Sequence, residues 1–186
     1  MLKFLLHTCC APCSIAIIDE LRPKFNLTVF FYNPNIFPIE EYHKRKAEVI
    51  KVCTEWGVTM IDMDYEAEKW CQAISGHEED AEGGARCELC FKFRLAKTAE
   101  YAKNNSFHYF GTSLTMGRNK SADVINPIGQ AFAKAYKIKF YSEDWKKGGR
   151  QEKGAKMVSD RGIYRQEYCG CVYSARDSTN GREPHE

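Results

Sequence analysis

The chain has 186 residues, of which 44% are hydrophobic and 28% charged, and its formal net charge is +2. Nine cysteines are too few for a small secreted disulfide scaffold, no signal-peptide pattern precedes them, and no run of about eighteen apolar residues predicts a membrane span. We therefore expect a cytoplasmic protein with reduced cysteines, folded as a single domain over residues 1–175 with a flexible tail over 176–186.

Apolar runs and helical periodicities alternate along the chain. Strands are predicted at residues 2–7, 27–32, 58–63, 107–111 and 138–141, and helices at 13–21, 39–56, 66–74, 87–103, 123–135 and about 154–161. Gly57 ends the second helix, and Pro127 marks an end or a kink of the fifth. The alternation predicts an α/β fold, an open and mostly parallel Rossmann-like sheet with helices on both faces, followed by a basic irregular or helical C-terminal segment.

Thiol and polar residues follow four of the predicted strands. In open parallel sheets, ligands bind beyond the carboxyl ends of the strands. Those positions hold Cys9 and Cys10, Asn33 to Asn35, Asp62 and Asp64, and Gly111 to Ser113. We therefore expect the functional site at this edge of the sheet.

The first cysteine group is His7-Thr8-Cys9-Cys10-Ala11-Pro12-Cys13, at a strand-to-helix junction. Pro12 suits the first turn of a helix. Free backbone N–H groups and the positive end of the helix dipole would favour thiolates there, the form that binds metals or attacks electrophiles. This turn is therefore suited to metal or redox chemistry.

Two further cysteine groups occur later in the chain. Cys87 and Cys90 are three residues apart, which places both sulfurs on one side of a helical turn. In Cys169-Gly170-Cys171, the glycine lets the backbone bend so that both thiolates face a common centre. The lone Cys53 and Cys71 are instead typical of small core residues.

The residues alone leave three kinds of chemistry open, namely an iron–sulfur or other redox site, a structural zinc site, and thiol–disulfide exchange. Structural zinc needs four ligands, whereas three clusters supply six or seven thiols. An iron–sulfur cluster with four cysteines would leave two or three thiols for a second metal or a redox partner. The count therefore favours a redox site.

Four motifs in the same order resemble the QueH family of epoxyqueuosine reductases. They are residues 7–13 (HTCCAPC), 31–36 (FYNPNI), 86–91 (RCELCF) and 164–171 (YRQEYCGC), and the resemblance covers residues 3 to 175. It implies a single catalytic domain, an oxidoreductase that removes the epoxide oxygen of epoxyqueuosine in tRNA to leave queuosine. It also implies a [4Fe-4S] cluster with another iron close by, and an external one-electron donor.

The resemblance also suggests roles for the thiols. We expect the cluster to be held by Cys87, Cys90, Cys169 and one thiol of the first group, for which we choose Cys10, although the sequence leaves the choice among Cys9, Cys10 and Cys13 open. Cys9 and Cys171 would hold the second iron, a Lewis acid for the epoxide oxygen. His7 is a candidate for catalytic proton transfer, although a lone histidine is often structural, and Asp62, Asp64 and Asp160 are other candidate acids.

A tRNA substrate requires cations near the site. Residues 134–165 hold ten Lys or Arg against four acidic residues, a charge run that is either an RNA-binding surface or only a solvated face. The candidate substrate contacts are Asn33, Asn35, Lys120, Lys146, Lys147, Arg150 and Arg165, with Lys153 and Lys156 in the same basic run. Trp145, Tyr164 or Tyr168 would stack on an exposed base, or would instead pack in the core.

Gly117-Arg118-Asn119-Lys120 departs from the Ser-Pro-aromatic-Lys expected of the family, although Lys120 keeps its place. The departure puts in doubt any role for the backbone of this loop.

Two alternatives come from other classes of protein. An ATP-dependent tRNA-modifying enzyme of related fold would carry a phosphate-binding loop after the first strand, but the loop here lacks the necessary glycines. A non-catalytic zinc module would bind RNA without turnover. Metal analysis separates the three hypotheses, and the sequence leaves the oligomeric state open.

Overall fold

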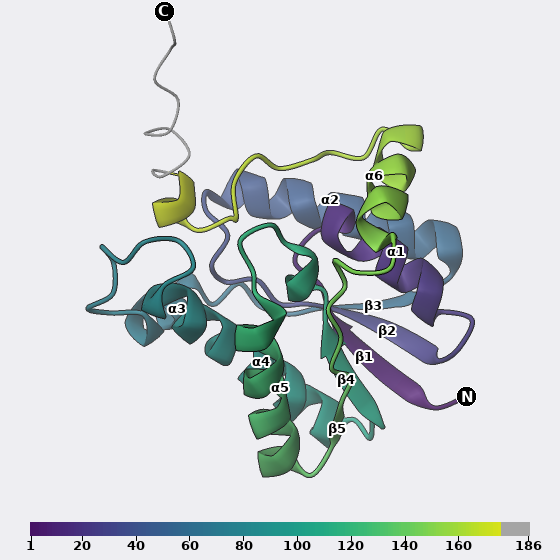
Figure 1. Ribbon diagram of the computed structural model, residues 1–186, viewed down its shortest axis with the longest axis horizontal. Coiled ribbons are helices and arrows are strands. Elements are labelled where there is room, and N and C mark those ends of the chain that lie inside the picture. Colours follow the sequence, from purple (N-terminus) through teal and green to yellow (C-terminus); the bar gives the residue numbers. More distant parts are fainter. Residues whose placement is uncertain (176–186) are drawn as a thin grey trace, which may run out of the picture.

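A computed structural model describes residues 1–175 as a five-stranded, all-parallel sheet with the strand order β3-β2-β1-β4-β5 (Figure 1). The strands are β1 (Lys3–His7), β2 (Asn26–Phe31), β3 (Thr59–Asp62), β4 (Tyr109–Thr112) and β5 (Lys139–Phe140). The chain starts in the centre of the sheet, moves outward to β3 and then crosses to the other side of β1. This order confirms the predicted α/β class.

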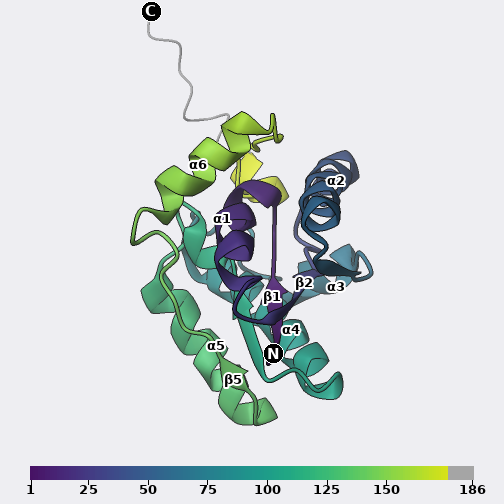
Figure 2. The same cartoon turned by 90° about the vertical axis from the view of Figure 1, so that its right-hand side faces the viewer.

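The helices connect successive parallel strands. They are α1 (Ala11–Leu21), α2 (Ile39–Trp56), α3 (Ala67–Ala73), α4 (Ala85–Asn104), α5 (Ala122–Tyr136) and α6 (Arg150–Asp160), with a short 3₁₀ helix, η1 (Leu114–Met116), after β4. Helices α1, α2 and α6 lie on one face of the sheet and α4 and α5 on the other (Figures 1 and 2).

Alternating residues of β1 build the two faces of the core. Phe4 and Leu6 pack in an apolar cluster with residues of α1, α2 and α6, whereas Leu5 packs on the opposite face against α4. All three side chains are fully buried. A central strand covered on both faces must be apolar along its whole length, which explains the continuous run at the start of the chain.

Most predicted boundaries lie within about two residues of the observed ones, and Gly57 ends α2 in a left-handed conformation with φ 62°. Two helices differ. Pro127 lies inside α5, and α6 begins at Arg150 rather than at residue 154, because Gly149 (φ 72°) turns the chain directly into it. The predicted tail, residues 176–186, lies outside the described residues.

Candidate metal centre

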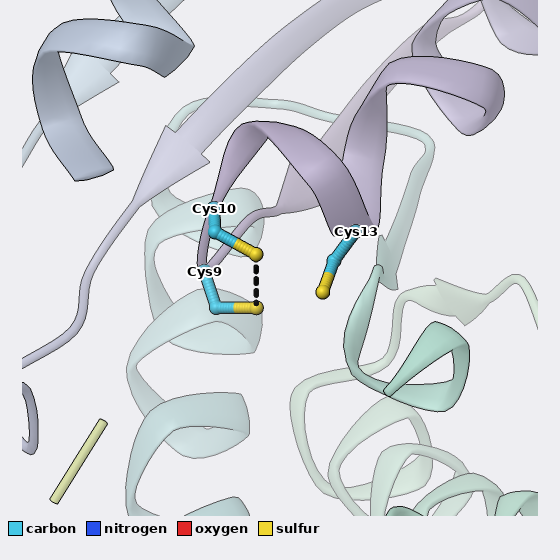
Figure 3. A group of neighbouring side chains, drawn as sticks. All are labelled: Cys9, Cys10 and Cys13. Atoms are coloured by element: carbon cyan, nitrogen blue, oxygen red, sulfur yellow. Dashed lines mark hydrogen bonds between the residues drawn. The ribbon is translucent and has the colours of Figure 1, made fainter. Parts of the chain in front are cut away.

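Three cysteines cluster where β1 ends and α1 begins. The sulfurs of Cys9, Cys10 and Cys13 all lie within 4.8 Å of one another, and the Cys9 and Cys10 sulfurs are 3.7 Å apart. Figure 3 shows the three side chains converging from this single turn. A group of thiols this compact can bind one metal ion.

The local sequence explains this turn. Cys10 has an extended backbone, and α1 starts directly after it with Pro12 in its first turn. The Ser14 hydroxyl donates a hydrogen bond to the Cys10 carbonyl, at 2.9 Å. Cys13 is therefore one helical turn from Cys9 and Cys10, which brings its sulfur back toward theirs.

The pKa values of the three thiols are shifted in different directions. Hydrogen bonds from Cys10 and Cys13 hold the pKa of the Cys9 thiol well below its usual range, aided by the charges of Lys120 and Arg94. Burial raises the pKa of Cys10 to about 12. Of the three thiols, Cys9 is therefore the one whose surroundings favour the thiolate form.

Four more cysteines lie near one another and next to the first group, although within residues 1–175 only Cys9, Cys10 and Cys13 have sulfurs close enough together to share one metal ion. Burial, together with the nearby sulfurs of Cys169, Cys90 and Cys171, raises the pKa of Cys87 to about 11. Cys90 and Cys171 belong to one apolar cluster, while Cys87 packs against the cluster that contains Cys9 and Cys10. Sulfurs from the beginning, middle and end of the described chain thus gather at the carboxyl edge of the sheet.

Two buried cations stand among these sulfurs. Burial works against the charge of Arg94, but the thiolates of Cys90, Cys9 and Cys169 outweigh it and raise the Arg94 pKa. The pKa of Lys120 is raised in the same way, against burial, by thiolates of both groups. Within residues 1–175 neither cation forms an ion pair with a carboxylate. A buried charge requires partners, and besides the Asn33 oxygen that accepts a hydrogen bond from Arg94, the neighbouring sulfurs supply the negative charge.

This donor set fits a thiolate-bound metal. Seven sulfurs supply soft, anionic ligands, and Arg94 and Lys120 offset part of the negative charge that several thiolates would accumulate. All nine cysteines are free, so none of the seven is consumed in a disulfide. Cys53 is buried in the core, as predicted, whereas the prediction that Cys71 is a core residue is wrong, because its side chain is exposed.

His7 is part of the support of the site. It is fully buried, and its ring nitrogens contact the Thr112 hydroxyl (2.9 Å) and the Tyr32 carbonyl (3.1 Å). Burial lowers its pKa to about 3, so the ring stays neutral near pH 7. These contacts tie β1 to its two neighbouring strands and lend no support to proton transfer by His7, a role that stays a prediction.

The two predicted substrate asparagines are buried beneath the sulfurs. Asn33 is 1% exposed, donates to the Thr8 carbonyl at 2.9 Å, and accepts a hydrogen bond from Arg94 at 2.6 Å. Asn35 is 4% exposed and lies near Gly170. Both positions suit fixing the cysteine-bearing segments better than contacting a large substrate directly.

Arg45 of α2 holds the third cysteine segment in place. Its guanidinium donates to the carbonyls of Cys169 (2.8 Å) and Tyr168 (3.1 Å) and pairs with Glu41 at 2.6 Å. Gly170 has φ 138°, and its carbonyl accepts a hydrogen bond from the Phe37 amide at 2.8 Å. The Cys-Gly-Cys turn is therefore anchored on both sides.

The cations of the basic C-terminal segment, residues 134–165, are less available to bind RNA than the composition of the segment indicates. Trp145 is 1% exposed, with its indole N–H donating to the Thr112 carbonyl, so it is a core residue rather than a stacking platform. Lys146 donates to the backbone carbonyls of Gly117 and Lys120. Arg150 is paired with Glu20 of α1 at 2.7 Å. The exposed Lys147 lies 3.6 Å from a carboxylate oxygen of Asp144.

Both remaining candidate stacking residues and two of the candidate acids also have partners. Tyr164 donates to Glu41 at 2.8 Å, and Tyr168 donates to the Phe37 carbonyl at 2.5 Å. Asp62 pairs with Lys46 and Asp160 with Lys156. The two acids belong to local surface ion pairs.

An open cleft of about 1260 Å³ adjoins the sulfurs. Cys13, Cys169 and Lys120 contribute to its wall, together with Gln166 and Arg165. The predicted contacts Lys120 and Arg165 therefore lie at the same cleft as two of the thiols, whereas Asn33 and Asn35 support it from beneath. A substrate group entering this cleft would reach the sulfur groups directly.

Sequence reasoning missed two residues of the site and left a third open. Cys13 was not chosen as a ligand, but it stayed open beside Cys9 and Cys10, and its helical spacing from them supports it. Gln166 donates to the Cys10 sulfur at 2.9 Å, a contact between distant segments that no local pattern signals. Arg94 follows Cys90 by one helical turn, but the sequence does not show that it is buried.

Comparison with known proteins gives a consistent result. A family model described as epoxyqueuosine reductase QueH matches residues 4–177. A protein of that name from Histophilus somni is 40% identical over 97% of this chain and 75% of its own length. Another from Thermotoga maritima is 36% identical over 97% of this chain and 93% of its own length.

Solved structures agree on the fold alone. A predicted subunit of a tRNA methyltransferase from Methanocaldococcus jannaschii has a TM-score of 0.55 at 12% identity, covering 88% of this chain and 91% of that chain. The U34-tRNA thiolase NcsA from Methanococcus maripaludis, solved with its [4Fe-4S] cluster, has a TM-score of 0.53 at 12% identity. The match covers 96% of this chain and 65% of that chain. The matches across nearly the whole sequence confirm the resemblance carried by the four motifs, and this chain belongs to the epoxyqueuosine reductase QueH family.

Proposed function

We propose that this chain is an oxidoreductase that reduces epoxyqueuosine in tRNA to queuosine, using a [4Fe-4S] cluster and an adjacent iron bound by its seven clustered cysteines. The observation that carries the proposal is the gathering of these sulfurs, with two buried cations, beside an open cleft. Family membership favours this function over the ATP-dependent and zinc-module alternatives.

The neighbours of each thiol support a division of labour between two groups. Cys171 is close enough to Cys87 to raise its pKa, and it packs in one apolar cluster with Cys90. We therefore place Cys171 with Cys87, Cys90 and Cys169 as a set of four thiolates for the cluster. Cys9, Cys10 and Cys13 then form a three-thiolate set for the second iron. This division moves Cys10 and Cys171 relative to the assignment made from the sequence.

The chain's own residues prepare the site. Arg94 and Lys120 lower the electrostatic cost of holding several thiolates together, and Gln166 donates a hydrogen bond to the Cys10 sulfur. Because Lys120 also lines the cleft, its ammonium can donate to a substrate oxygen as negative charge develops there. When bound, the iron centres would supply two single-electron transfers and a Lewis acid for the epoxide oxygen.

The surroundings of the reaction follow from the same residues. Removing the oxygen as water takes two electrons and two protons, and we propose that an external one-electron donor supplies the electrons singly. Nine free cysteines also suit a reducing compartment, so we place the enzyme in the cytoplasm. No helix within residues 1–175 combines the length and apolarity needed to cross a membrane.

Metal analysis of single variants tests the ligand assignment. Cys87→Ser, Cys90→Ser and Cys171→Ser should each remove most acid-labile sulfide and the brown absorbance of anaerobically reconstituted protein. Cys13→Ser should keep the sulfide and lose about one iron per chain. Unchanged sulfide in Cys171→Ser would return that residue to the second iron.

Turnover tests the function itself. Iron-loaded protein, a low-potential reductant and tRNA carrying epoxyqueuosine should yield queuosine under anaerobic conditions, as measured by mass spectrometry of the digested nucleosides. Cys9→Ser should retain much of the cluster and stop turnover. If the fully loaded parent leaves epoxyqueuosine unchanged, the proposed function is wrong.

A further inference from the structure

The cations of the basic C-terminal segment are largely engaged within the protein. Lys153 of α6 pairs with Asp19 of α1, and Lys156 pairs with Asp160, both at 2.7 Å. Arg150 also reaches α1, through Glu20. Each such pair is worth little stability at the surface. It nevertheless reduces the positive field that this segment offers to a polyanion.

Two arginines differ from these cations in position and in partners. Arg118 lies in the loop between η1 and α5, and Arg165 follows α6. Both side chains are exposed, both line the cleft beside Cys13 and Cys169, and neither has a carboxylate partner within residues 1–175. They approach one cleft from two segments far apart in the sequence.

The loop that carries Arg118 is held firmly. The Lys146 ammonium donates to the carbonyls of Gly117 (3.4 Å) and Lys120 (2.7 Å), on both sides of Arg118. A Cβ atom on Gly117 would meet the Lys120 side chain at 2.8 Å, which shows how tightly this loop closes on its own lysine. Lys146 therefore supports the loop, and Arg118 is the side chain left free to bind.

We propose that Arg118 and Arg165 form a clamp for the phosphates that flank the modified nucleotide, so that RNA enters across the cleft rather than along α6. The proposal rests on the proposed function, since it concerns the substrate of that site. Guanidinium groups bind phosphate oxygens through paired hydrogen bonds. Glu82, Glu152 and Glu167 also line the cleft, so attraction is concentrated at the two arginines rather than spread over a basic surface.

Salt-dependent RNA binding tests the clamp with a matched control. The probe is a fluorescent anticodon stem–loop RNA with unmodified guanine at the wobble position, so the measurement needs no turnover. Arg118→Met/Arg165→Met should weaken binding on the order of tenfold or more, and should lower the slope of log affinity against log salt by roughly 1.4. Lys153→Met/Lys156→Met removes the same charge from α6 and should change both values little.

Iron and sulfide contents of the same preparations show whether the site remains intact. An unchanged salt slope in the arginine variant, or an equal loss in the lysine variant, would overturn the clamp, as would failure of the parent to bind the hairpin. If the arginine variant shows the predicted fall in slope but the iron-loaded parent does not reduce epoxyqueuosine, the result counts against the proposed function and leaves the clamp standing.

Discussion

Replacing Arg45 with methionine should be among the most damaging changes outside the cysteines. Its side chain is 1% exposed and connects Glu41 to the carbonyls of Tyr168 and Cys169. Removing one partner of a buried ion pair leaves an unpaired charge and costs about 3–5 kcal/mol. Marginal stabilities of about 5–15 kcal/mol make this a large fraction of the total. We therefore expect Arg45→Met to lower the free energy of unfolding by about 3–5 kcal/mol.

The assay is urea unfolding of the metal-free protein at 25 °C, with iron per chain measured separately after reconstitution. Arg45→Met should lower both values, because the Cys169 backbone loses its anchor. Arg45→Lys should recover only part of each, since an ammonium cannot hold two carbonyls and Glu41 in the same geometry. Lys46→Met is the matched control on the same helix, because its pair with Asp62 is partly exposed and should be worth under about 1 kcal/mol.

The double variant Arg45→Met/Glu41→Gln distinguishes the stability lost with the ion pair from the stability lost with the hydrogen bonds to the two carbonyls. If the unpaired carboxylate causes most of the loss, the double variant should be less destabilised than the sum of the single variants. An Arg45→Met protein that unfolds like Lys46→Met and binds the parent amount of iron would refute this reasoning.

Two other predictions concern the frame of the site. Gly111→Ala should lower the free energy of unfolding by about 1–3 kcal/mol, because a Cβ there would lie 2.9 Å from the buried ring of Phe4; unchanged urea unfolding would contradict this. The Arg150 hydrogen bond lowers the pKa of Glu20, so this carboxylate stabilises the fold above its unfolded pKa, and the benefit disappears as pH falls through the lowered folded value. In urea unfolding, Glu20→Gln should therefore be less stable than the parent near pH 7, and the difference should shrink steadily as the pH is lowered below the ordinary glutamate value of 4.5. A difference that stays constant over this range would exclude the linkage.

The sheet could be predicted from the sequence because its signals are local. Apolar runs bounded by Pro23, Gly57 and similar breakers fixed the alternation of strands and helices, and the alternation implies parallel pairing. The family could be predicted because its four motifs are also local strings. Placing the cysteines at the carboxyl edge followed from the general behaviour of such sheets.

The parts that could not be predicted depend on contacts between distant segments. A count of charges in residues 134–165 cannot show that Arg150 and Lys153 meet carboxylates of α1. Nor does it show that Trp145 fills the core. The proposed division of the seven thiols into two groups likewise depends on how the C-terminal segment folds back over α4, which the spacing within each motif leaves undetermined.

Gly170 limits how the sulfur-rich end of this protein could be redesigned. Its φ of 138° is closed to ordinary side chains, and an added Cβ would lie 3.0 Å from the Arg45 guanidinium. Gly170 therefore cannot be replaced by a residue with a side chain in order to change the surroundings of the sulfurs. An engineer who wants to alter the electronic properties of the proposed iron site would have to change residues outside the turn, such as Arg45 or Gln166, and leave Gly170 unchanged.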